Sequence, residues 1–400
     1  MKRFTVTALA IMAALVATGL YQRARATVEP QAGPTPRNIG RQVPVFEYDE
    51  TFPRPLPNNW TTGTVVGIDV DARQHIWMVH RAPTLRPDEL HGEATPPLGD
   101  CCVKAPYVIE LDYAGNVVQA WGGPSPTGEY DWPTNGGVSP DPTAGNAPSG
   151  MHSVMVDHKD NVWLTATGPG DGQILKFTRT GKFLAQYGHP KRPKPDSNDT
   201  ENANSSSGIA IFPKTNEVFV SDGYGNRRVL VLDADTAKYK RHWGAYGKRP
   251  DDSIRYQYNP DKMFEQFSTV HGIGVSRDGL VYACDRNGSR VQVFKQDGTF
   301  VMEKGIERQT LNGTVFGIAF SADPEQRFAY IPDGRNEKIW ILERKTLDII
   351  GSFGCPGHAG GCFTTPHSIA TDAKGNIYIG ETWEGKRIQR FLYKGLRSLS

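Results

Sequence analysis

The 400-residue sequence lacks several features that would assign it quickly to a functional class. Its formal net charge is only +2, and its Lys and Arg residues are spread through expected loops rather than gathered in a stripe. Without such a stripe there is nothing to hold a phosphate backbone, so nucleic acid is excluded as a partner. After residue 26 no stretch is apolar enough to span a bilayer. We therefore expect a monomer that acts on a small molecule or a peptide, without membrane contact once a signal segment is removed.

Cysteine is also scarce, with five residues, so at least one must stay unpaired. Cys355 and Cys362 bracket a loop rich in Gly and Pro, CPGHAGGC, which can close a small disulfide. The adjacent Cys101 and Cys102 are not expected to bridge each other. Cys284 either pairs with one of these two or is a small buried strand residue, and the sequence leaves the pairing open.

The N-terminal residues read as a signal for export. Lys2 and Arg3 precede an apolar run over 4–21, and Ala24-Arg25-Ala26 has the small-x-small pattern of a cleavage site. These features predict a signal peptide over 1–26 and a periplasmic or secreted protein, while an uncleaved anchor stays open. Residues 27–42 are rich in Pro, Arg and Gln without periodicity, so we expect a flexible lead-in.

The stretch VHGIGVSRDGLVYACDRNGSRVQVFKQDGTFV, residues 270–301, is the clearest copy of a repeat. Short apolar runs alternate with Arg-Asp-Gly, Asn-Gly-Ser and Gln-Asp-Gly turns, a pattern typical of a four-stranded antiparallel meander. Five more copies begin at Gly67, Ser153, Gly208, Gly317 and Ser368. Four-stranded repeats of about 40 to 50 residues indicate a β-propeller. The sequence predicts an all-β, six-bladed propeller over residues 43–400.

Three further patterns bear on how the ring is built. The last repeat has only three strands, so the strand expected over 43–50 should complete it and close the ring. The last strands of several blades end in aromatic-Gly pairs, whose rings should pack between blades. Three long segments, 124–150, 190–207 and 248–267, should lie as loops on one face, where binding usually occurs.

One repeat position carries histidine in alternate blades. The residues just before the six inner-strand anchors are Val66, His152, Ser207, His271, Phe316 and His367. A single histidine there would be an ordinary hydrogen-bonding residue, but three at one offset, among ten histidines in all, are a rare coincidence. Alternate blades stand at threefold positions around the channel, so the imidazoles should converge. Three imidazoles with an open fourth position are typical of a catalytic zinc, and we predict a Zn²⁺ site.

Arginine and tyrosine recur at the end of the second strand. Arg81 and Arg286 occupy one offset in blades one and four, and Tyr224 lies one residue further along in blade three. The end of the second strand lies beside the start of the first in an antiparallel pair, which places these side chains on the face of the histidines. The simpler interpretations are a solvated turn arginine, a packed loop tyrosine and, for the nearby acidic residues, turn caps. Those acidic residues are Asp222, Asp285, Asp333 and Glu381.

Three stretches carry a resemblance to a known family. Residues 220–233, 271–294 and 366–381, VSDGYGNRRVLVLD, HGIGVSRDGLVYACDRNGSRVQVF and PHSIATDAKGNIYIGE, resemble the NHL-repeat propeller of peptidyl-α-hydroxyglycine α-amidating lyase. The resemblance extends from about residue 63 to residue 391. It implies zinc held by the three histidines, Tyr224 as the base, and Arg81 and Arg286 as residues that contact substrate. It also implies a structural Ca²⁺ in the channel.

The sequence departs from the family pattern at several points. An Asp that follows the last histidine, and that supplies a calcium ligand in the family, is here Ser368, which weakens the transfer of calcium. Gly225 stands where the family has a disulfide cysteine, and Thr365 stands where it has a Met beside the metal. The chain also has no copper monooxygenase module to make the hydroxyglycine.

The family's chemistry would cleave the C–N bond of an α-hydroxyglycine carbinolamide to give an amide and glyoxylate. Zinc would lower the pKa of the bound hydroxyl, while Tyr224 needs nearby positive charge to act as a base. We expect Arg81 to supply that charge and Arg286 to hold the departing carboxylate, and the exchanged assignment also stays open. Two other functions stay open as well: a non-catalytic propeller that binds a peptide or glycan, and another propeller lyase or hydrolase acting on a small secreted molecule.

Overall fold

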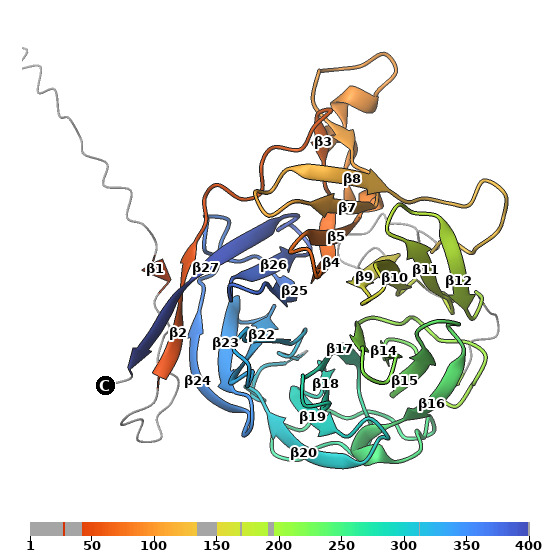
Figure 1. Ribbon diagram of the computed structural model, residues 1–400, viewed down its shortest axis with the longest axis vertical. Coiled ribbons are helices and arrows are strands. Elements are labelled where there is room, and N and C mark those ends of the chain that lie inside the picture. The colour runs from red at the N-terminus through yellow and green to blue at the C-terminus, as the bar shows by residue number, and fades with distance from the viewer. Residues whose placement is uncertain are drawn as a thin grey trace, which may run out of the picture.

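The computed structural model describes residues 27–28, 42–133, 150–168, 170–190, 196–311 and 313–398. These residues form six antiparallel sheets arranged radially around a central channel, as the ring in Figure 1 shows. No α-helix occurs in these ranges, where the only helical segments are short 3-10 turns. The prediction of an all-β, six-bladed propeller is confirmed. Because each sheet has two faces to bury, each blade packs on its neighbours on both sides.

Blades one to five each contain four consecutive sheet strands. Blade one holds β4 (Thr64–Val70), β5 (Ile76–Arg81), β7 (Val108–Leu111) and β8 (Val117–Trp121). Blade two holds β9 (Met151–Val156), β10 (Asn161–Ala166), β11 (Ile174–Thr178) and β12 (Phe183–Tyr187). Blade three holds β13 (Ile209–Phe212), β14 (Glu217–Asp222), β15 (Arg228–Asp233) and β16 (Tyr239–Trp243). Blade four holds β17 (Val270–Val275), β18 (Val281–Asp285), β19 (Arg290–Phe294) and β20 (Phe300–Gly305). Blade five holds β21 (Ala319–Phe320), β22 (Phe328–Asp333), β23 (Lys338–Glu343) and β24 (Asp348–Phe353).

Blade six is built from both ends of the propeller. Its inner strands are β25 (Pro366–Thr371), β26 (Ile377–Glu381) and β27 (Ile388–Ser398). The outer strand is β2 (Gln42–Tyr48), which pairs antiparallel with β27, and β1 (Thr27–Val28) pairs in turn with β2. The N-terminal strand therefore closes the ring, as the missing fourth strand of the last repeat predicted. Residues 1–26, where the sequence predicts a signal peptide, and most of the lead-in lie outside the described residues.

Aromatic rings at the ends of outer strands pack across the blade boundaries. The ring of Trp121 lies 5.3 Å from that of Phe177 in the next blade, and Trp243 lies 5.8 Å from Phe294. At the closure, Phe353 lies 5.0 Å from Phe46 of β2. Such pairs contribute about 0.5–1.5 kcal/mol each beyond the area that they bury. The prediction from the aromatic-Gly strand ends is confirmed at these boundaries.

The inner strands of neighbouring blades approach to backbone contact. A Cβ atom on Gly272 would lie 2.6 Å from the Cα of Gly317 in the next blade, and one on Gly67 would lie 2.6 Å from the Cα of Ser153. Only glycine allows this approach, because any side chain would push the strands apart. These two glycines within the inner strands therefore allow neighbouring blades to approach closely beside the histidines.

Blade one departs from the regular repeat between its second and third strands. Residues 82–107 include η1 (Ala82–Thr84), η2 (Pro87–Glu89), η3 (His91–Glu93) and β6 (Val103–Lys104), which pairs parallel with β3 (Trp60–Thr61). This excursion projects from the ring in Figure 1. The fourth 3-10 turn, η4 (Ala245–Gly247), follows β16. No helix of the described residues has the length and apolar character needed to cross a membrane.

The cysteines pair differently from the sequence-based expectation at one point. Cys101 and Cys102 are joined, with Cα atoms 3.0 Å apart, so the expectation that neighbours do not bridge is wrong here. Cys355 and Cys362 are joined as predicted. Cys284 is free and buried, because β18 places it in the core between blades, and no bridge to Cys101 or Cys102 exists.

Candidate functional site

The six residues at the shared histidine offset surround one level of the channel. They come from the inner end of each blade, and inner strands such as β4, β9, β17 and β25 border the centre of the ring in Figure 1. Five of the six line a small cavity of about 70 Å³; these are Val66, His152, His271, Phe316 and His367. Residues at the same position of each repeat therefore lie at the same height along the channel.

The three predicted histidines come together. The ring centroids of His152, His271 and His367 are 4.7–4.9 Å apart, and one nitrogen of each lies within 4.8 Å of the others. All three side chains are buried. Imidazole nitrogens at this spacing can share one ion at the ordinary metal–nitrogen distance of about 2.0–2.1 Å.

Two of the histidines are oriented by backbone carbonyls of the following blade. The Nδ1 atom of His271 lies 2.5 Å from the oxygen of Phe316, and the Nδ1 atom of His367 lies 2.9 Å from the oxygen of Val66. A carbonyl oxygen only accepts, so Nδ1 carries the proton and Nε2 presents its lone pair. The non-histidine members of the ring therefore hold the histidines in the tautomer that a metal requires.

His152 lacks the matching support, and its ring is incompletely satisfied. The carbonyl of Ser207, which would be its counterpart, instead accepts a hydrogen bond from the Thr165 hydroxyl. Its Nδ1 lies 3.4 Å from the Ser153 hydroxyl, and its Nε2 is buried with no hydrogen-bond partner among the described residues. An unpaired buried nitrogen costs about 1–3 kcal/mol, and a cation at this point would remove that cost.

Burial keeps the three imidazoles neutral. Loss of solvent is the main cause that lowers their pKa values, and the positive charges of Arg81 and Arg286 lower them further. The pKa of His367 falls to about 3. Neutral rings are what a metal ligand needs, because a protonated imidazole has no lone pair to donate. The histidine trio therefore fits Zn²⁺ by donor type, spacing and charge, and His271 and His367 fit it by tautomer as well.

Tyr224 and Arg286 lie directly above the histidines. The Tyr224 hydroxyl lies 3.1 Å from Nε2 of His271 and accepts a hydrogen bond of 2.8 Å from Nη1 of Arg286. The Arg286 guanidinium also stacks over the rings of Tyr224 and Phe316, at 5.0 and 5.2 Å from their centroids. Tyr224 is 41% exposed, so a molecule in the channel mouth can reach its hydroxyl.

Arg81 lies on the other side of the trio. Its Nε donates to the oxygen of Met151, next to His152, and its Nη2 donates to the Thr167 hydroxyl, each at 2.9 Å. Burial lowers the pKa of Arg81 to about 10, although Tyr224 and Asp171 oppose the shift. The arginine that contacts the Tyr224 phenol directly is thus Arg286. This contact favours the alternative in which Arg286 supplies the positive charge for Tyr224 and Arg81 holds the carboxylate.

The recurring acidic residues act as caps, as the simpler interpretation predicted. Asp285 accepts hydrogen bonds from the backbone nitrogens of Ser268 and Thr269, at 3.0 and 2.8 Å, and pairs with Arg290. Glu381 likewise accepts from the nitrogen of Thr364, at 2.7 Å. These carboxylates hold the segments that lead into His271 and His367, so they position the ligands without entering the channel.

The long loops lie against the turns that carry the site. The oxygen of Ser205 accepts a hydrogen bond from the nitrogen of Tyr224, and the Tyr256 hydroxyl donates to the oxygen of Asn287, at 2.5 Å. These contacts place the loops over 196–207 and 248–267 beside Tyr224 and Arg286, as expected for the walls of the site. Residues 134–149 and 191–195 of the predicted loops lie outside the described part of the chain.

Two residues of the site were not singled out from the sequence. Phe316 packs between two of the histidines, with its ring centroid 5.5 Å from that of His271 and 5.9 Å from that of His367. Arg335 sits in the Asp333-Gly334-Arg335 turn, which aligns with Asp222-Gly223-Tyr224. That alignment was the signal in the sequence that could have pointed to Arg335.

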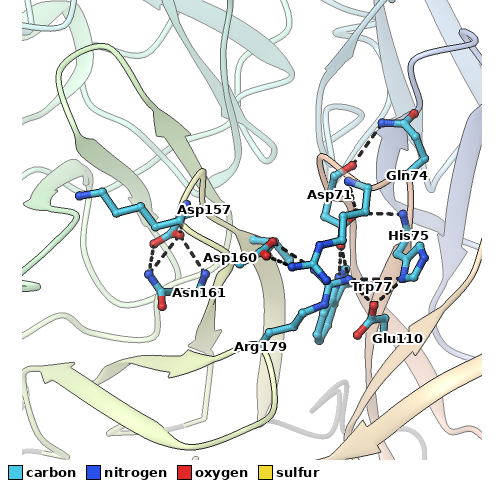
Figure 2. A network of polar contacts seen from close by, with 12 residues as sticks. Asp71, Gln74, His75, Trp77, Glu110, Asp157, Asp160, Asn161 and Arg179 are labelled. Atoms are coloured by element: carbon cyan, nitrogen blue, oxygen red, sulfur yellow. Dashed lines mark hydrogen bonds and ion pairs between the residues drawn. The ribbon is translucent and has the colours of Figure 1, made fainter.

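A second group of possible ligands lies elsewhere, between blades one and two. Asp71, His75 and Glu110 also bring one ligand atom each within 4.8 Å of one another. Figure 2 shows that the Arg179 side chain reaches into this group. It pairs with Asp71 at 2.7 Å and with Glu110, so a protein cation already occupies the place that a metal would take.

Comparison with known proteins places the fold in a class and then adds likenesses. The chain is a six-bladed propeller with an NHL repeat, whose family model matches residues 267–294. A solved structure of a Bacteroides thetaiotaomicron protein of unknown function has a TM-score of 0.50 at 13% identity, covers 84% of this chain and 70% of its own, and supports the fold alone.

Two curated relatives are similar in sequence. Peptidyl-α-hydroxyglycine α-amidating lyase 1 of Drosophila melanogaster is 26% identical over 295 residues, or 67% of this chain and 47% of its own length. NHL repeat-containing protein 3 of Homo sapiens is 22% identical over 267 residues, or 62% of this chain and 67% of its own. The chain thus spans about half the length of the amidating lyase that it matches. The resemblance to amidating lyases is confirmed at modest identity, and it suggests a lyase.

Proposed function

We propose that the protein is an exported, zinc-dependent lyase that cleaves the C–N bond of an α-hydroxyglycine-type carbinolamide to an amide and glyoxylate. The observation that carries the proposal is the buried histidine trio with Tyr224 and Arg286 directly above it. A propeller that only binds a ligand has no need for three neutral, converging imidazoles, one of which has an unpaired buried nitrogen.

The residues that would hold zinc are His152, His271 and His367, through their Nε2 atoms. When bound, Zn²⁺ supplies Lewis acidity that lowers the pKa of a substrate hydroxyl. The carbonyls of Phe316 and Val66 fix two of the rings, so little reorganisation is needed on binding.

Calcium is a separate expectation from the family resemblance. The Ser368 hydroxyl is buried without a hydrogen-bond partner among the described residues, but it brings no charge to such a site.

Tyr224 is the residue we propose to move the proton. Its phenolate would take the proton of the substrate hydroxyl, the carbinol C–O would become the C=O of glyoxylate, and the C–N bond would break. The leaving amide nitrogen would then take up one proton, which completes the balance. Arg286 stabilises the phenolate because its Nη1 already donates to the Tyr224 oxygen.

Arg81 is the residue we propose to attract the substrate carboxylate. It is buried beside His152 and held by Met151 and Thr167, so its position is fixed before a substrate arrives. A preorganised guanidinium on that side neutralises the carboxylate that leaves as glyoxylate. The substrate would thus lie between blade one, where Arg81 binds its carboxylate, and blades three and four, which carry Tyr224 and Arg286.

The test joins metal analysis to turnover. We expect about one zinc per chain in the purified protein, and release of glyoxylate from α-hydroxyhippurate that requires the metal. A chain without stoichiometric zinc and without turnover would instead fit a propeller that binds a peptide or glycan. Zinc without glyoxylate release would point to another propeller lyase or hydrolase. Identification of the N-terminus of the exported chain would test cleavage of the signal peptide.

A further inference from the structure

Arg335 is a charged residue at the channel mouth that the proposed chemistry leaves without a role. It lies on the turn after β22 of blade five, at the repeat offset that Tyr224 occupies in blade three. The same offset in blade six carries Trp383, which is 49% exposed. The residues of these turns therefore form a rim around the mouth, with the base on one side and Arg335 and Trp383 on another.

The turn that carries Arg335 is packed onto the wall of the site. A Cβ atom on Gly334 would lie 3.1 Å from the Phe316 ring and 3.0 Å from the oxygen of Pro366, the residue before a zinc-binding histidine. The Glu337 carboxylate accepts a 2.6 Å hydrogen bond from the nitrogen of Thr365. Phe316 in turn lies beneath the Arg286 guanidinium. Arg335, Phe316 and Arg286 therefore belong to one continuous wall.

The Arg335 guanidinium is available for a ligand. The residue is exposed, and among the described residues its side chain has no hydrogen-bond or ion-pair partner. Partial burial lowers the pKa of Arg335 and the positive charge of Arg286 lowers it further, while Glu337, Asp333 and Tyr224 oppose the shift. By contrast, the rim residue Lys386 pairs with Glu89 at 2.7 Å, and Arg387 pairs with Glu381 at 2.7 Å. The Glu337 and Asp333 carboxylates oppose the repulsion between the two guanidinium groups, and an anion bound beside Arg335 would reduce that repulsion further.

The proposed function fixes which part of a substrate would meet Arg335. The hydroxyl belongs at the histidines, and Arg81 on blade one takes the carboxylate of the hydroxyglycine. Tyr224 and Arg286 are engaged with each other on blades three and four. The acyl group on the amide nitrogen must extend through the remaining sector, which is formed by blades two, five and six. Arg335 stands in that sector.

We propose, on the basis of that function, that the site prefers substrates with a second acidic group: α-hydroxyglycine amides whose acyl part carries a carboxylate, which Arg335 binds. A charge-assisted pair with a guanidinium is stronger than a neutral hydrogen bond and can be bidentate. The acidic group would sit a few bonds from the scissile C–N bond, because Arg335 shares a wall with Arg286.

A matched pair of substrates tests the proposal. N-(4-carboxybutanoyl)-α-hydroxyglycine and N-(4-carbamoylbutanoyl)-α-hydroxyglycine have nearly the same shape and differ in one negative charge. We expect the zinc-loaded full chain to cleave the carboxylate substrate with a kcat/KM at least about tenfold higher, mainly through KM. Arg335→Gln should remove this preference and leave cleavage of the carboxamide within about twofold.

Two further variants separate recognition from a structural role. Arg335→Lys keeps the charge but not the fork, so part of the preference should return. Arg54→Gln, far along the chain on an exposed segment before blade one, should leave the preference unchanged. The proposal is overturned if the chain cleaves both substrates equally, or if Arg335→Gln slows both to the same extent. If neither these substrates nor α-hydroxyhippurate is cleaved, the proposed function fails as well.

Discussion

The channel trio and the cluster between blades one and two both bring three possible metal ligands close together, yet they differ in the partners that the ligand atoms already have. In both, three possible ligand atoms lie within 4.8 Å. In the channel, Nε2 of His152 is buried and has no hydrogen-bond partner within the described ranges. Between the blades, every ligand side chain is engaged: Asp71 accepts from Trp77 at 3.0 Å and from Arg179, and Glu110 contacts His75 at 2.5 Å and Arg179 (Figure 2).

We infer from this difference that close ligand atoms mark a possible metal site when they lack partners, and that proximity alone does not. Burial by itself would raise the pKa of Asp71, but hydrogen bonds from Trp77 and His75 and the Arg179 charge hold it below the usual value. That carboxylate is stabilised without any ion. In the part of the chain that the structure describes, the converging nitrogens of the channel imidazoles have no such partner apart from the Tyr224 hydroxyl at His271.

The largest effect should come from removing one histidine from each cluster. His271→Ala should bring bound zinc from about one per chain to near zero and lower turnover by more than about a hundredfold, because the ligand itself is lost. His75→Ala should leave zinc content and turnover unchanged. Elemental analysis of both variants checks the comparison. Zinc lost from His75→Ala but kept in His271→Ala would reverse the assignment of the two clusters.

Tyr224→Phe separates the base from the metal. Removal of the phenol should lower kcat by about 10²–10⁴-fold, the usual contribution of a positioned acid or base, while zinc content stays the same. Tyr393→Phe is a matched control, since Tyr393 is 38% exposed but lies on β27 in the outer part of blade six. Steady-state kinetics with glyoxylate detection measures both variants. Full activity in Tyr224→Phe would rule out the tyrosine base.

Arg179→Ala tests the cluster between the blades as a structural lock. The change leaves the buried carboxylates of Asp71 and Glu110 without their cation, so the free energy of unfolding should fall by about 3 kcal/mol. Chemical denaturation measures the loss, and zinc content at low denaturant should not change. Lys182→Ala, on the exposed turn that follows Arg179, is a control that should cost little. An unchanged stability in Arg179→Ala would show that the pairs do not join the two blades.

His80 should make stability depend on pH, and its effect should be the most gradual because it is spread over several pH units. It is fully buried and neutral, with Nδ1 accepting from the nitrogen of Gly63 and Nε2 donating to the oxygen of Pro106. Burial lowers its pKa from 6.5 to about 4, against the opposing hydrogen bonds to Pro106 and Ala105. Between those values the unfolded chain binds a proton that the folded chain does not. Stability should therefore fall as pH drops from 6.5 towards 4, by on the order of 3 kcal/mol in total.

The variant His80→Gln should flatten that part of the stability curve, while His158→Gln, at an exposed position, should leave the slope as it is. Denaturation midpoints at several pH values give the comparison. A slope that is the same in the parent and in His80→Gln would assign the acid sensitivity to other groups.

The repeat pattern predicted the blades and the histidine trio because both depend on local, periodic information. Turn residues and alternating apolar positions fix each meander, and a shared offset fixes a shared height in the channel, as His152, His271 and His367 show. The closing strand followed from the same logic, since an open edge in blade six needed a partner.

The repeat pattern did not predict which residues contact each other between blades. Arg179 meets Asp71 across more than a hundred residues of chain, and no motif links the two positions. The same holds for the carbonyls of Val66 and Phe316 that hold the histidines, and for the choice of Arg286 over Arg81 beside Tyr224. The excursion over 82–107 breaks the repeat, so the pairing of Cys101 with Cys102 within it had no template.

The pairing of β2 with β27 determines when the protein becomes complete during synthesis. Strand β2 is synthesised early but can pair only after β27 has been made, and His367 is synthesised only with the sixth blade. The first five blades can form before the sixth is made, but together they contain only His152 and His271 of the three histidines. A ribosome-bound chain stalled before β25 would carry only two of the three imidazoles, so the zinc binding proposed above would require the completed sixth blade.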